Sequence, residues 1–66
     1  MRRMLPADAL RARAIGRGLT NARRAGNRDR ELRYRKRARA MIETFGSDAQ
    51  REIGRGRRDQ LRRARG

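Results

Sequence analysis

The chain has 66 residues, and its 21 basic side chains against seven acidic ones give a net charge of +14 at neutral pH. A chain of this length has room for one small domain, which buries only about 60% of the unfolded surface. Cysteine and histidine are absent, which excludes a disulfide framework, a thiolate metal site and the usual nucleophile–base pairs. No apolar run reaches the roughly 18 residues of a membrane span, and no apolar signal segment follows the basic start. We therefore expect a cytoplasmic protein.

The apolar content is low for a protein that folds alone. Leucine, isoleucine and phenylalanine together make 9 of the 66 residues, and valine is absent. Low hydrophobicity combined with high net charge is typical of chains that gain order with a partner. We predict a single small domain over residues 1–66 that is marginally stable alone and more ordered on a polyanion.

The first segment, residues 1–26, predicts two short helices with a weak passage between them. Pro6 suits the first helical position. Gly16 and Gly18 then interrupt the helical pattern, and Thr20 is a good cap for a helix that restarts after them. The two helices are predicted at about 6–15 and 20–25.

The middle segment gives the clearest helix, over residues 28–45. Asn27 is a good N-cap, and Gly46 stands where a left-handed C-cap belongs. Apolar side chains recur between them at spacings that place them on one helical face, which we expect to pack on the flanking helices. These side chains are Tyr34, Ala38, Met41, Ile42 and Phe45.

The third segment predicts a helix-turn-helix corner at 45–48 and two further short helices. Gly54 and Gly56 weaken the helical pattern in its middle. The helices are predicted at about 48–53 and 57–65. The predicted fold class is therefore all-α, as a small bundle or an extended array of five short helices.

The tetrapeptide Ile-Gly-Arg-Gly occurs twice, at residues 15–18 and 53–56. In a chain with seven glycines and twenty arginines, coincidence explains this better than an internal repeat, since the flanking residues do not match.

The positive charge is spread along the whole chain, with net charges of +6, +4 and +4 over residues 1–26, 27–46 and 47–66. Seven basic residues between positions 28 and 39 repel one another and have two acids nearby, an arrangement that contributes nothing to a fold. We therefore favour binding to a polyanion over a merely solvated helix face. The predicted nucleic-acid-binding residues are Arg23, Arg24, Arg28, Arg30, Arg33, Arg35, Lys36, Arg37, Arg39, Arg55, Arg57, Arg58, Arg62 and Arg63.

Residues 21–24 and 28–40 resemble the arginine-rich RNA-binding helices of phage antiterminator proteins, in which a short basic helix docks into an RNA hairpin. The resemblance implies a phage or bacterial source. Within this stretch Tyr34 suits the apolar helix face better than stacking on an unpaired base. Residues 34–40 are also similar to the basic helix that leads into the zinc knuckle of HNH-type nucleases, which need the histidine and cysteines that this chain lacks.

The seven acidic residues each have a simple role at a helix start or beside an arginine, and no phosphate-binding glycine loop is present. We therefore expect no catalytic residue, no cofactor and no metal. The predicted function is non-enzymatic binding of RNA or DNA, in a ribonucleoprotein, packaging or phage regulatory role. The alternative is a protein-interaction module that binds an acidic protein through a basic amphipathic helix. A homodimer formed through the same apolar face also stays open.

Overall fold

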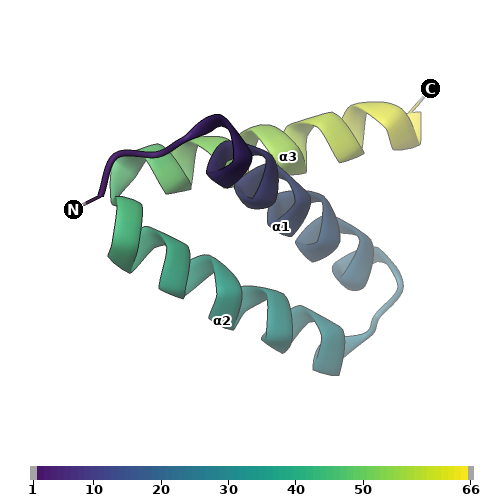
Figure 1. The fold of residues 1–66 in the computed structure, drawn as a ribbon. Coiled ribbons are helices and arrows are strands. Elements are labelled where there is room, and N and C mark those ends of the chain that lie inside the picture. Colours follow the sequence, from purple (N-terminus) through teal and green to yellow (C-terminus); the bar gives the residue numbers. More distant parts are fainter. Residues whose placement is uncertain (1, 66) are drawn as a thin grey trace.

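Three helices make up most of the chain: α1 spans Pro6–Arg24, α2 spans Arg28–Phe45 and α3 spans Ser47–Arg65. The structure is a computed structural model that describes residues 2–65, so positions 1 and 66 of the predicted domain lie outside the described residues. After a short loop α2 runs back along α1, and α3 then crosses behind α1 (Figure 1). The bundle measures 33 × 26 × 16 Å. The predicted all-α class is confirmed.

The α2 helix has the predicted bounds because both of its ends are fixed by local groups. At its start, the Asn27 side-chain oxygen accepts a hydrogen bond of 3.1 Å from the backbone N–H of Arg30. At its end, Gly46 has a φ of 69° and donates its N–H to the Ile42 carbonyl at 2.7 Å. A positive φ is readily adopted by glycine alone, so the chain turns at this residue into α3.

The α1 helix is continuous, and the prediction of two short helices in the first segment is wrong. Gly16 lies directly against the backbone of α3 near Ile53, and Gly18 lies against the ring of Tyr34. Thr20 does not cap a new helix, since its hydroxyl donates to the Gly16 carbonyl at 3.2 Å within α1. Packing against the neighbouring helices outweighs the cost of about 1 kcal/mol for each glycine in a helix.

The α3 helix is also continuous, and the predicted break between 48–53 and 57–65 is wrong. Gly56 is buried and lies against the backbone of Arg13 in α1. Gly54 makes no such contact, and the space beside it is open apart from the end of the Arg58 side chain. Tertiary contact at Gly56 therefore holds together a helix that propensity alone would interrupt.

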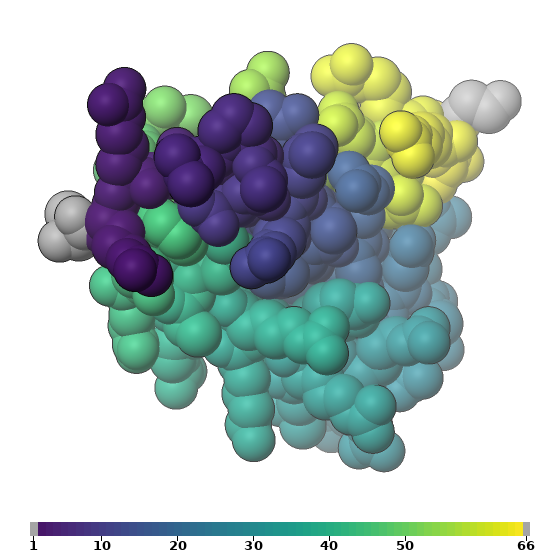
Figure 2. All heavy atoms as spheres, viewed as in Figure 1, coloured from purple at the N-terminus to yellow at the C-terminus, as the bar shows by residue number. Residues whose placement is uncertain are grey.

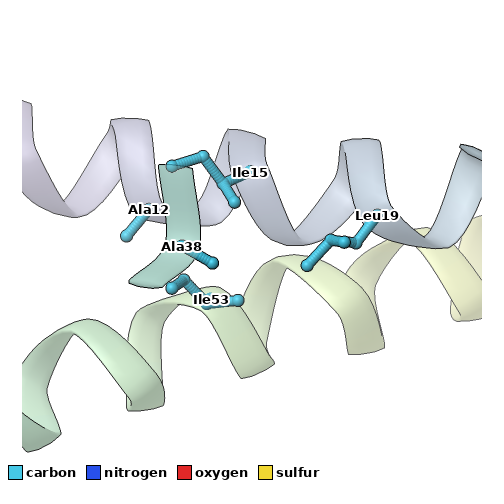
Figure 3. Close-up of a cluster of buried hydrophobic side chains, with 5 residues drawn as sticks. All are labelled: Ala12, Ile15, Leu19, Ala38 and Ile53. Carbon is cyan, nitrogen blue, oxygen red and sulfur yellow. The ribbon is translucent and has the colours of Figure 1, made fainter. Parts of the chain in front are cut away.

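The core is a small cluster to which all three helices contribute. Figure 3 shows Ala12, Ile15 and Leu19 of α1 facing Ala38 of α2 and Ile53 of α3. Partly buried side chains surround this cluster: Met4, Tyr34, Met41 and Ile42. The apolar side of α2 thus packs on its neighbours, as predicted. Close approach of backbones at alanine and glycine replaces the large side chains that the sequence lacks.

Candidate nucleic-acid interface

Glu52 links α3 to α1. Its carboxylate accepts a hydrogen bond from the Arg13 guanidinium, with Nε and Oε2 2.8 Å apart, and lies 3.3 Å from Arg55 of its own helix. The Glu52 side chain is 13% exposed, so this pair is better shielded from solvent than the other arginine–carboxylate contacts of α3. One acid therefore joins two helices and also pairs with an exposed arginine of its own helix.

Glu31 plays the same part between α1 and α2. The Arg23 Nε atom lies 2.9 Å from the Glu31 carboxylate, and Arg35 approaches the same oxygen at 3.5 Å. Arg23 is the penultimate residue of α1, so the pair closes the end of the helix hairpin. Two of the seven acids of the chain are thus used to join helices.

Arginine contacts shift the pKa values of both acids downward. The hydrogen bond from Arg13 holds the pKa of Glu52 below its ordinary value of 4.5, against partial desolvation, which raises it. The hydrogen bond from Arg23 lowers the pKa of Glu31 in the same way. A pKa that is lower in the folded state than in the unfolded state stabilises the fold above the unfolded value. That contribution is lost as the pH falls through the folded value.

We therefore expect the free energy of unfolding to fall as the pH is lowered through about 4.5, where unfolded glutamates are half protonated. The Glu52→Gln variant should be less stable than the wild-type protein at pH 7, and the difference between them should shrink in acid. Urea unfolding between pH 7 and 3, followed by circular dichroism, measures this. The matched control is Glu43→Gln, because Glu43 forms no ion pair among residues 2–65. An equal pH dependence for both variants would contradict the role of Glu52.

Most of the positive charge is left without a partner. Among the described residues, five arginines lie within 4.0 Å of a carboxylate: Arg13, Arg23, Arg35, Arg51 and Arg55. The other sixteen of the 21 basic side chains have no carboxylate at that distance within the described part of the chain. All fourteen residues predicted to bind nucleic acid are exposed. Three of the fourteen, Arg23, Arg35 and Arg55, are in ion pairs.

The basic residues of α2 form two stripes on opposite flanks of its buried side. Side chains three, four or seven positions apart share one side of a helix. The first stripe, which we call the open stripe, has no ion pair among the described residues and consists of Arg30, Arg33 and Arg37. The second stripe lies on the flank of Glu31 and consists of Arg28, Arg35 and Arg39. The open stripe therefore has the higher uncompensated charge.

The predicted residues do not all meet on one surface. From the corner at Gly46, α2 and α3 diverge, so the basic end of α3 lies apart from α2 (Figure 1). Arg24 and Arg28 flank the short loop between α1 and α2. The structure thus brings the end of α1 together with α2, and the C-terminal half of α3 lies against α1 and away from α2. Four predicted residues lie on this half of α3: Arg57, Arg58, Arg62 and Arg63.

A groove of about 620 Å³ lies between α1 and α2 and was not predicted from the sequence. The two helices meet along one line in the space-filling view (Figure 2). Apolar and aromatic side chains line the groove: Ala14, Ile15, Tyr34, Ala40, Met41 and Phe45. Its charged lining consists of Arg2, Asp8, Arg11 and Arg37. Arg2 and Arg11 are absent from the predicted set, because only the fold brings them beside Arg37.

Tyr34 is held in place beside this groove. Its ring packs on Gly18 and against the core cluster, as expected for a residue of the apolar helix face. The Arg37 guanidinium lies over the same ring, 5.6 Å from its centroid. Such a cation–π contact is worth about 0.5 to 1 kcal/mol at an exposed site. A flat cationic group therefore lies at the edge of an apolar groove.

Two other kinds of feature are absent from residues 2–65. No three metal-ligating side chains lie close enough together to hold an ion, and no helix has the length and hydropathy needed to cross a membrane. No protein-family model, curated protein or solved structure matches the chain. The charges and the groove are therefore the features of this protein that bear on its function.

Proposed function

We propose that this chain is a non-enzymatic nucleic-acid-binding protein that holds the phosphate backbone with arginines from all three helices. The observation that carries the proposal is the set of sixteen basic side chains with no carboxylate within 4.0 Å among the described residues. Phosphates that neutralise such side chains release condensed counterions, which supplies most of the free energy of non-specific binding. The proposal includes a cytoplasmic location and a ribonucleoprotein, packaging or phage regulatory role, on RNA or DNA.

Most of this positive charge does not stabilise the fold. Among residues 2–65, Arg13 and Arg23 are the only basic residues in ion pairs that join one helix to another. Every further arginine adds repulsion to a small domain with a thin core, and self-repulsion destabilises a compact state. A partner of opposite charge removes that cost, which supports binding to a polyanion as the role of the surface.

The open stripe is spaced for a phosphate backbone. Arg30 and Arg37 are seven residues apart, which is about 10 Å along a helix axis and equals about three nucleotides of one strand. Arginine also contacts phosphate through two parallel hydrogen bonds, which lysine does not. A chain with twenty arginines and one lysine is therefore well suited to bind phosphates through paired hydrogen bonds.

A salt titration of binding tests the proposal. Duplex DNA, hairpin RNA and an acidic polypeptide are each titrated with the protein between 50 and 200 mM salt, with fluorescence anisotropy as the readout. A protein that contacts about 6 to 10 phosphates should lose about three to five decades of affinity over this range. We expect that loss with at least one nucleic acid.

The acidic polypeptide separates this proposal from its rival. Tight binding to the polypeptide, with no binding to either nucleic acid, would overturn the proposed function and favour an acidic protein as the partner. Binding to the RNA hairpin alone, or to the duplex alone, would decide which nucleic acid is the partner.

A further inference from the structure

We propose that the groove between α1 and α2 is a binding site for an unstacked base of a single nucleic-acid strand, with the neighbouring phosphates on the arginines at its rim. The inference rests on the proposed function and names the form of nucleic acid that the protein prefers. It concerns a site that the basic composition alone does not predict.

The lining of the groove suits the face of a base. Tyr34, Met41 and Phe45 come from one side of α2, and Ile15 faces them from α1. Bases that are not paired in a duplex stack on aromatic and apolar side chains, and this contact tolerates any base. The volume of about 620 Å³ lies within the range of small-ligand sites, about 300 to 1,000 Å³. A duplex keeps its bases stacked on one another and cannot place one in the groove.

The rim of the groove suits the phosphates on either side of that base. Arg2 comes from the segment before α1, Arg11 from α1 and Arg37 from α2, so three elements converge on one opening. The backbone N–H of Arg2 donates to the Thr44 carbonyl at 2.9 Å, which fastens the first segment against α2. The single acid of the lining, Asp8, accepts a hydrogen bond of 3.1 Å from the Leu5 N–H. Three positive charges thus face one negative charge.

Arg37 connects the groove to the open stripe. Its guanidinium is held over the Tyr34 ring, and a guanidinium plane also stacks on bases. The same residue continues the line of Arg30 and Arg33 along α2. A strand whose base enters the groove therefore meets further arginines as it leaves. Because the groove and the open stripe form one continuous basic path, a nucleic-acid strand fits it better than an acidic peptide. An acidic peptide would need carboxylates spaced like the phosphates of a strand.

Filling the groove tests this inference. Ala40 is exposed and lines the groove, so Ala40→Phe would occupy the space while leaving the core cluster and the net charge unchanged. The matched control is Ala64→Phe, at an exposed position near the end of α3. Each protein is titrated with a 12-nucleotide single strand that carries one 2-aminopurine, and with a blunt-ended duplex that has the same number of phosphates. Circular dichroism shows whether each variant is folded.

We expect the wild-type protein to quench 2-aminopurine fluorescence and to prefer the single strand. Ala40→Phe should weaken binding of the single strand about tenfold, within the range for one stacked base, and leave duplex affinity unchanged. Ala64→Phe should behave as the wild-type protein. If Ala40→Phe fails to fold, Arg11→Gln compared with Arg65→Gln replaces it, because both arginines are exposed and, of the two, Arg11 lines the groove.

Three results would overturn the inference, and they differ in what they leave standing. If the strand and the duplex bind equally, and neither Ala40→Phe nor Arg11→Gln relative to Arg65→Gln changes binding, the groove is not a base site but nucleic-acid binding stands. Preference for the strand without quenching places the contact elsewhere on the surface. If the protein binds an acidic peptide and not nucleic acid, and Ala40→Phe abolishes that binding, both proposals are wrong.

Discussion

The Gly56→Ala variant should unfold more easily than the wild-type protein by about 2 kcal/mol, whereas Gly54→Ala, two residues earlier in the same helix, should be more stable by up to about 1 kcal/mol. The same substitution is thus expected to have opposite effects at neighbouring positions. The difference comes from what a methyl group would meet at each one.

A methyl group at Gly56 has no room. Its carbon would lie 2.8 Å from the Cα atom of Arg13 and closer still to the Arg13 carbonyl oxygen, so two helix backbones would have to separate. Overpacking of this kind costs about 1 to 3 kcal/mol, and backbone has less freedom to relax than a side chain. At Gly54 the nearest atom is the end of the Arg58 side chain at 3.4 Å, which leaves only the gain in helix propensity.

Thermal and urea unfolding of the two variants, followed by circular dichroism, measures the difference. Gly16→Ala is a second test of the same contact, since its methyl carbon would lie 2.9 Å from the Arg57 nitrogen and closer to the Ile53 carbonyl oxygen. We expect Gly16→Ala to destabilise the protein as Gly56→Ala does. Equal stabilities for Gly54→Ala and Gly56→Ala would contradict the close packing of α1 on α3.

These glycines also explain which parts of the fold could be predicted. The bounds of α2 depend on Asn27 and Gly46, whose effects are local and are visible in the sequence. The continuity of α1 and α3 depends on contacts between residues about 40 positions apart, which no local pattern contains. Gly16 and Gly56 suggest interruptions when each helix is considered alone. In the bundle they are the residues that let two backbones touch.

The two Ile-Gly-Arg-Gly segments lie at this same contact. Ile15 and Ile53 are both in the core, and Gly16 of the first segment lies against the backbone of Ile53 in the second. The contact is not symmetric, because Gly56, the fourth residue of its segment, meets Arg13 outside the first segment. The two segments therefore share one helix contact but pack differently, since Gly54 lies beside open space where the equivalent Gly16 is closely packed.

The candidate interface could be predicted in part for the same reason. The exposure of the fourteen basic residues could be predicted because charged side chains are rarely buried. In the structure all fourteen lie at the surface. The groove could not be predicted, because Arg2, Arg11 and Arg37 are far apart in the sequence and have no shared periodicity. The ion pairs between helices could not be predicted from the sequence either. Arg13 is the partner of Glu52 because of the way α1 crosses α3.

Neutralising the open stripe is expected to have the largest effect on binding. The variant Arg30→Gln, Arg33→Gln, Arg37→Gln removes three charges that have no ion pair among residues 2–65. If each contacts one phosphate, the slope of log affinity against log salt should fall by about 3. Extrapolated from 1 M salt, this corresponds to a loss of about a hundredfold at 150 mM.

The matched control is the triple variant Arg35→Gln, Arg51→Gln, Arg55→Gln. It removes the same number of charges, but from arginines that already have carboxylate partners. Both triple variants have a net charge of +11, so a general effect of charge predicts equal losses. An effect of position predicts a clearly smaller loss for the control, because its arginines must leave Glu31, Asp48 or Glu52 to reach a phosphate. Equal slopes for the two variants would mean that only the net charge of the protein matters for binding. The position of the arginines on α2 would then contribute nothing.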